Sequence, residues 1–193
     1  MKFKLVFCVL IALAIPPAIF AESAQNENAS GLRGATILII RHAEDADVGR
    51  GLSPVGAARA RDYAIYFKNF TIGGRPLKLD YIFATRDSRN SDRPRLTVEP
   101  TGQEPGLTID DRFKSNQFMG LVDEIKSRPH GANILISWHH GKSPQLLRAL
   151  GADPRGLLPN GKWPDDAFSW LIQLRYDENG YLFESKRICL QAP

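Results

Sequence analysis

The chain has 193 residues, of which 43% are hydrophobic and 24% charged, with a formal net charge of +4. This length suits one domain with a sizeable core, and the composition is that of an ordinary globular protein. So small a charge argues against nucleic acid as a partner. The two cysteines, Cys8 and Cys189, show no metal-binding pattern.

Residues 1–21 have the pattern of an export signal. Two lysines precede an almost unbroken apolar run at 5–15, two prolines end that run, and polar sequence begins at Glu22, directly after Ala21. The run is too short to cross a bilayer comfortably. We therefore predict cleavage after Ala21 and a periplasmic or extracellular protein without a stable membrane anchor. The alternative is an uncleaved anchor.

The remaining sequence predicts a short tether and one folded domain. Residues 22–34 are polar and rich in Gly, Ser and Asn, which indicates a flexible tether before a domain at 35–193. In chain order we predict strands at 36–40, 81–84 and 134–136, helices from 53, around 118–125 and from 143, and two final strands within 168–187. Ser53 and Ser143, each before a proline, are the predicted N-caps. This alternation predicts an α/β three-layer sandwich, with a mostly parallel central sheet and helices on both faces.

Arginine and histidine side chains, which often bind ligands or take part in catalysis, directly follow the three predicted parallel strands. Arg41 and His42 follow the first strand, a polar arginine-rich loop at 85–95 follows the second, and His139 and His140 follow the third. Because ligands bind beyond the carboxyl ends of such strands, we expect these residues to converge. Arginine matches phosphate oxygens with a planar fork of donors, and neutral histidine is a nucleophile. The pattern predicts a phosphoryl-transfer site without metal or cofactor, since no HEXXH-type spacing or acidic cluster accompanies it.

Four short motifs follow these strands in a recognisable order. They are Arg41-His42-Ala43, then Gly51-Leu52-Ser53-Pro54-Val55-Gly56, then Arg93 four positions before Thr97, and finally His140-Gly141. In this order they resemble the histidine phosphatase superfamily, which has the phosphoglycerate mutase-like fold, over roughly residues 36–187. Alanine stands at position 43 where the family has glycine, a small-for-small change.

The resemblance implies a role for each matched residue. His42 takes the phosphoryl group and becomes phosphohistidine, while Arg41, Arg93 and His140 hold the phosphate oxygens. Water then releases the phosphate, and a carboxylic acid protonates the leaving group. The implied substrate is a small phosphorylated molecule.

Two of these motif matches have alternative residues nearby in the sequence. Arg93 shares its segment with three other arginines, and only its spacing to a threonine selects it. The three are Arg86, Arg89 and Arg95. His140 is favoured over His139 because it precedes a glycine, whereas counting back from the proline of the next helix favours His139.

The proton donor is the most open assignment. One branch of the family carries an acid directly after the second histidine, but Gly141 stands there in this chain. The other branch carries it after the second arginine, which favours Asp111 and leaves Asp110 and Glu44 as alternatives. A site without such an acid favours substrates with good leaving groups.

The leading prediction is an exported, metal-independent phosphatase that hydrolyses phosphate monoesters through a phosphohistidine on His42. A mutase is disfavoured because short connections leave little material for a cap over the site. Two alternatives stay open: a non-catalytic phosphate- or anion-binding domain of the same fold, and a phosphatase of cell-envelope sugar phosphates. Specificity is expected to lie in the loops at 71–79, 98–118 and 152–167.

Overall fold

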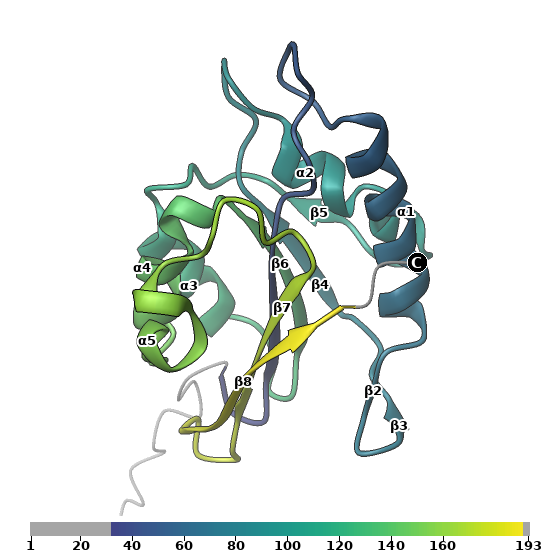
Figure 1. Ribbon diagram of the computed structural model, residues 1–193. Coiled ribbons are helices and arrows are strands. Elements are labelled where there is room, and N and C mark those ends of the chain that lie inside the picture. Colours follow the sequence, from purple (N-terminus) through teal and green to yellow (C-terminus); the bar gives the residue numbers. More distant parts are fainter. Residues whose placement is uncertain (1–31, 191–193) are drawn as a thin grey trace, which may run out of the picture.

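The computed structural model describes residues 32–190, whose strands and helices form three layers (Figure 1). The predicted signal at 1–21 and most of the predicted tether at 22–34 lie outside the described residues. Two residues at the end of that tether are held in place, because Arg33 Nε donates to the carbonyl of Glu178 and Gly34 N to that of Asp177. No helix in this described part has the length and apolar character that crossing a membrane requires.

A six-stranded sheet in the order β5-β4-β6-β1-β7-β8 forms the middle layer. Its strands are β1 (Thr36–Arg41), β4 (Tyr81–Ala84), β5 (Ile109–Asp110), β6 (Asn133–Trp138), β7 (Trp170–Tyr176) and β8 (Leu182–Cys189). The first four run parallel, while β7 is antiparallel to β1, and β8 to β7. A separate hairpin consists of β2 (Thr71–Ile72) and β3 (Arg75–Pro76). The prediction of a mostly parallel central sheet is confirmed.

Helices cover both faces of the sheet, as predicted. Figure 1 shows α1 (Pro54–Lys68) and α2 (Arg93–Val98) on one side, and α3 (Phe118–Lys126), α4 (Ser143–Ala149) and α5 (Pro154–Leu157) on the other. The described residues also form three short 3-10 helices: η1 (Thr101–Gln103), η2 (His140–Lys142) and η3 (Pro159–Gly161). The central strands therefore lie between two helical layers.

Strand β1 is buried on both faces, which explains its unbroken apolar sequence. Ile37 and Ile39 pack into the core beside α3 and α4, while Leu38 and Ile40 pack into the core beside α1. All four side chains are fully buried. Burial of each is worth about 1.5–3 kcal/mol relative to exposure. The carboxyl end of β1, where the chemistry is predicted, is thus anchored from both sides.

Two local predictions were wrong in detail. Arg93 belongs to α2 rather than to a loop, because Pro94 occupies the first turn of that helix, where a missing N–H costs nothing. Ser143 does not cap α4, because η2 runs directly into that helix and the N–H of Ser143 donates to the carbonyl of His139. Ser53 does cap α1, since its side chain accepts a hydrogen bond from Gly56 N at 3.0 Å.

Candidate active site

His42 follows β1 directly and is almost completely buried, with 1% of its surface exposed. Its Nδ1 lies 2.9 Å from the carbonyl oxygen of Ala43. A carbonyl oxygen only accepts hydrogen bonds, so Nδ1 carries the ring proton and the lone pair lies on Nε2. The backbone thereby fixes the tautomer in which Nε2 can attack an electrophile.

The surroundings also keep His42 uncharged. Burial, together with the charges of Arg41, His139 and Arg93, lowers the pKa of His42 to about 3. Desolvation is the largest cause, because burial disfavours the protonated ring. His42, the predicted nucleophile, is therefore neutral over the whole ordinary pH range.

Arg41 ties the nucleophile to a loop from the other end of the chain. Its Nη1 donates to the carbonyls of Pro164 at 2.9 Å and Asp165 at 2.7 Å, and the guanidinium stacks 4.0 Å from the centre of the Phe168 ring. Its Nε is buried without a hydrogen-bond partner. A buried donor without a partner is costly, so this N–H is suited to an oxygen of a bound phosphate.

Thr97 explains the spacing by which Arg93 was selected. Its Oγ1 accepts a hydrogen bond from Ala43 N at 2.8 Å and donates to the carbonyl of Arg93 at 2.7 Å. The threonine therefore joins α2 to the residue after the nucleophile. Because a helix places positions four apart on one face, the carbonyl of Arg93 and this hydroxyl meet.

Arg93 reaches the nucleophile through a carboxylate that the sequence analysis did not single out. Its Nη1 lies 3.0 Å from Asp45 Oδ2, and Asp45 Oδ1 lies 3.3 Å from His42 Nδ1. Arg95, by contrast, pairs with Asp87 and with a glutamate one helical turn away. Of these two arginines of α2, Arg93 is the one that borders the site.

Both candidate histidines lie beside the nucleophile. The ring centres of His139 and His140 are 5.4 and 5.7 Å from that of His42. Burial lowers the pKa of His139 to about 4 and also lowers the pKa of His140. His140 Nε2 lies 2.9 Å from Asp165 Oδ1, at the outer edge of the cluster. The structure thus brings both histidines together and gives His140 a carboxylate partner.

The structure does not bring the predicted proton donor, Asp111, to this cluster. Asp111 follows β5, which is three strands from β1, or about 14 Å at the usual spacing of roughly 4.8 Å. It lines a separate hollow beside Asp110, whose pKa is lowered by its ion pair with Arg112 despite partial burial. Asp111 was predicted from its position after the second arginine in the sequence, whereas the order of the sheet separates its segment from β1.

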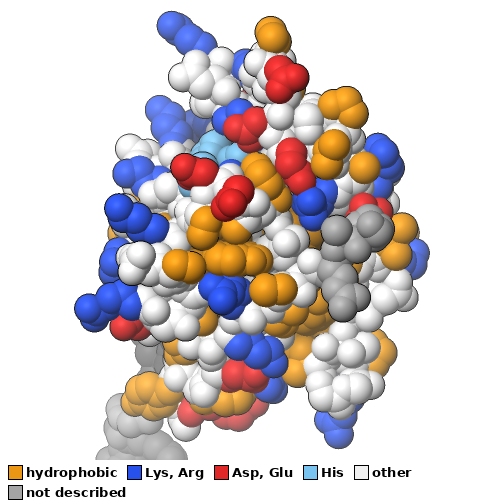
Figure 2. Space-filling model, viewed as in Figure 1, with side chains coloured by type: hydrophobic (Ala, Val, Ile, Leu, Met, Phe, Trp, Pro, Cys, Tyr) orange, Lys and Arg blue, Asp and Glu red, His pale blue; other side chains and the backbone are white. Residues whose placement is uncertain are grey.

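Glu44, the other alternative, is bound elsewhere. Its carboxylate accepts two hydrogen bonds from Arg59 Nε and one from Nη2 at 2.6–2.9 Å, which lower its pKa against the opposing effect of burial. The carboxylates that do reach the cluster are Asp45 and Asp165. The side chain of Asp45 is 48% exposed and that of Asp165 is 94% exposed. Figure 2 shows histidine surface between acidic side chains at this end of the molecule.

A signal for one of these two acids was present in the sequence. Asp45 lies three positions after His42, close enough to contact the same ring across a tight bend. Asp165 had no such signal, because it lies in the loop between η3 and β7, which follows no periodic pattern. Within residues 32–190 no group of three or more His, Cys, Asp or Glu side chains has a metal-binding arrangement.

Comparisons with known proteins place the fold. No family model and no curated protein sequence matches the chain. Among solved structures, it is similar to phosphoglycerate mutase from Plasmodium falciparum, with 15% identity and a TM-score of 0.54 over 82% of this chain and 94% of that one. It is also similar to a protein named as the phosphohistidine phosphatase SixA from Agrobacterium tumefaciens, with 19% identity and a TM-score of 0.50 over 78% and 96%. The predicted phosphoglycerate mutase-like fold is confirmed.

Proposed function

We propose that this phosphoglycerate mutase-like chain is a histidine phosphatase, which hydrolyses phosphate monoesters through a covalent phosphohistidine on His42. One observation carries the proposal: a buried, neutral histidine presents Nε2 within a cluster of two arginines and two further histidines. The group consists of Arg41, His42, Arg93, His139 and His140. A nucleophile surrounded by hydrogen-bond donors suits a substrate that is negatively charged and gains further negative charge on its oxygens during transfer.

In the first step, His42 Nε2 attacks phosphorus. The N–P bond forms as the bond between phosphorus and the ester oxygen breaks, and the leaving oxygen takes a proton. Arg41 Nε and the guanidinium of Arg93 stabilise the charge on the phosphoryl oxygens. Asp45, between Arg93 and His42 Nδ1, stabilises the positive charge that the ring gains when Nε2 is phosphorylated.

The proton for the leaving group comes from the His140–Asp165 pair in its protonated form, which is more populated at acidic pH because burial lowers the pKa of His140. These two side chains share a contact of 2.9 Å at the edge of the cluster, where the leaving group meets solvent. In the second step, a water molecule attacks phosphorus, the N–P bond breaks, and phosphate departs while the pair takes the proton of that water. The exposed carboxylates around the cluster leave access for water, which favours hydrolysis over retention of the phosphoryl group.

The test is hydrolysis of p-nitrophenyl phosphate, with and without chelator, by the parent protein, His42→Ala and His130→Ala. His130 is an exposed histidine outside the cluster and serves as the matched control. We expect activity that survives chelation and is lost by about 10³-fold or more in His42→Ala only. Labelled substrate quenched in alkali should leave phosphohistidine on the parent protein. Vanadate binding without turnover would instead support the anion-binding alternative.

We also propose that the enzyme acts outside the cytoplasm on small phosphorylated molecules. The support is the sequence of residues 1–21, which precede the described part of the chain. Mass spectrometry of the protein recovered after expression with its own N-terminus tests this proposal. A chain that begins at Glu22 supports export with cleavage, whereas retention of Met1 in a soluble cytoplasmic fraction contradicts it.

A further inference from the structure

We propose that the site has a second anion-binding subsite, so that the natural substrate carries a further acidic group beyond the phosphate that is transferred. The proposal deepens the phosphatase assignment and rests on it. The subsite is the hollow between α4 and the loop that includes η3. Arg148 and Lys162 provide its positive charge, and Gln145 lies on the same wall.

The hollow is continuous with the candidate active site. His140 and Asp165, the pair that faces the leaving group, are also part of the lining of the hollow. The part of the substrate that departs lies next to its proton donor, so its remaining atoms extend toward this space. The cavity measures about 410 Å³, which leaves room for a leaving group larger than a simple alcohol.

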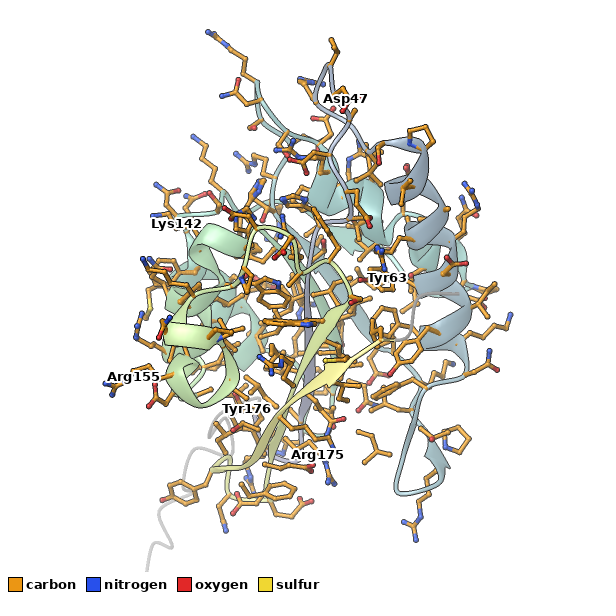
Figure 3. The ribbon with its side chains drawn as sticks, viewed as in Figure 1. Asp47, Tyr63, Lys142, Arg155, Arg175 and Tyr176 are labelled. Carbon is orange, nitrogen blue, oxygen red and sulfur yellow. The ribbon has the colours of Figure 1, made fainter. Side chains whose placement is uncertain are left out.

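The positive charges of the hollow form no close ion pair. Within residues 32–190, neither Arg148 nor Lys162 has a carboxylate within ion-pair distance, although the charge of Arg148 contributes to the lowered pKa of Asp153. The acid on the lining, Asp165, is already in contact with His140 Nε2. Figure 2 shows Lys and Arg side chains gathered along the side of the molecule where α4 and α5 lie, and Figure 3 places Lys142 at the upper end of that side.

Other features of the lining indicate a polar occupant. Gln145 Oε1 is buried without a hydrogen-bond partner, and such an acceptor needs a donor, such as a hydroxyl of the substrate, rather than an anionic oxygen. Asn160, two positions before Lys162, is the one non-glycine residue with positive φ (51°) in the described part of the chain, a conformation that asparagine adopts readily in turns.

Hydrogen bonds also connect the wall of the hollow to Arg41, the residue beside His42. Arg41 holds the carbonyls of Pro164 and Asp165, in the same loop that presents Lys162. Positions 140 and 148 are eight residues apart, or about 12 Å along the helical path at roughly 1.5 Å per residue. The geometry therefore favours a substrate in which the second acidic group lies several bonds from the scissile phosphate.

Binding of unreactive phosphonates tests the subsite without relying on turnover. Calorimetry at low salt measures the affinities of two ligand series of increasing length, the alkane α,ω-bisphosphonates and the ω-carboxyalkyl phosphonates. Each ligand is compared with the alkyl monophosphonate of equal length. We expect one length to bind about tenfold or more tightly than its monophosphonate. The two series distinguish a second phosphate from a carboxylate. This gain should disappear in Lys162→Ala and Arg148→Ala and persist in the control Arg61→Ala, an exposed arginine of α1.

The outcomes separate this inference from the phosphatase assignment. The subsite is wrong if monophosphonates bind but neither the bisphosphonates nor the carboxyalkyl phosphonates bind more tightly at any length. It is also wrong if Arg61→Ala abolishes the gain in affinity as fully as Lys162→Ala and Arg148→Ala do. In both cases the phosphatase assignment can stand. If the gain depends on Lys162 but the parent hydrolyses no phosphate ester, the subsite stands and the catalytic assignment fails. If no phosphonate binds, the subsite is overturned, and hydrolysis of p-nitrophenyl phosphate by the parent protein alone decides the phosphatase assignment.

Discussion

The candidate site has two parts that are built in opposite ways. The phosphate end consists of Arg41 and His42, and the mouth consists of the carboxylates Asp45 and Asp165. At the phosphate end, Arg41 and His42 are at most 2% exposed and are held by backbone carbonyls and by the packing around β1. At the mouth, the side chains of Asp45 and Asp165 are 48% and 94% exposed and come from irregular segments. The proposed nucleophile is thus fixed by the core, whereas the exposed carboxylates at the mouth can vary without cost to the fold.

This difference indicates which part of the candidate site determines stability and which part determines substrate preference. Changes at the buried end should cost stability as well as activity, because the same contacts serve both. Changes at the mouth should alter substrate preference and leave the fold intact, as is usual for loops on a rigid scaffold. Predictions at the two ends test that division.

The largest effect is expected for Gly56→Ala at the buried end. A Cβ atom at this position would clash with the carbonyl oxygen of Glu44 and lie 2.9 Å from its nitrogen, so the backbone beside His42 would have to move. We expect a loss of about 3 kcal/mol in the free energy of unfolding, measured by urea denaturation, together with loss of phosphatase activity.

Gly156→Ala in α5 is the matched control, since a Cβ there meets nothing within 4 Å. It should change stability by less than about 1 kcal/mol. Equal stability of Gly56→Ala and the parent would show that the loop after β1 is not rigidly packed against α1, and would remove the basis of the comparison.

A pH effect on stability is expected next, again from the buried end. The folded protein holds the pKa of His42 at about 3, against 6.5 for an unperturbed histidine. Between these values the unfolded chain binds a proton that the folded protein does not, so stability is full above about pH 6.5 and falls as the pH drops toward 3. Each such histidine contributes a slope of up to about 1.4 kcal/mol per pH unit.

Urea denaturation at a series of pH values below 6.5 measures this slope. His42→Gln should remove the contribution of one proton from the slope, which is up to about 1.4 kcal/mol per pH unit, whatever its effect on stability at neutral pH. His130→Gln, a change of the same kind at an exposed position, should leave the slope as in the parent. An unchanged slope in His42→Gln would mean that His42 is not held neutral by the fold.

The same division explains how far the sequence could predict the structure. The end of β1 was predictable, because a continuous apolar strand followed by Arg41 and His42 is set by local pattern and burial. Arg93 was selected by its spacing to Thr97, and the hydrogen bonds of Thr97 give that spacing its physical reason. These features depend on neighbours that are close in sequence or on strands with strong patterns.

The mouth could not be predicted in this way. Asp165 meets His140 because Arg41 holds the loop carbonyls near the nucleophile, a contact over more than a hundred residues that leaves no periodic trace. The position of Asp111 relative to the cluster also depends on long-range contacts. Its strand, β5, has only two residues, and the sheet order that removes it from β1 follows from tertiary packing.

The smallest of these effects is expected for Asp165→Asn at the mouth, and it should depend on the substrate. Loss of the carboxylate matters most when the leaving oxygen needs a proton, so kcat/KM should fall about tenfold more for an alkyl phosphate than for p-nitrophenyl phosphate. The loss is modest because His140, which remains in place, can still supply a proton. Steady-state kinetics with the two substrates measures this ratio.

Asp45→Asn is the matched change at the other exposed carboxylate. Asp45 contacts Arg93 and His42, not the leaving group, so its removal should alter both substrates by the same factor. Unfolding of both variants should resemble that of the parent, since the two side chains are exposed. If Asp165→Asn and Asp45→Asn change the substrate ratio equally, the His140–Asp165 pair is not the proton donor. The mouth would then act only through its charge, and the two ends of the site would differ in burial but not in chemical role.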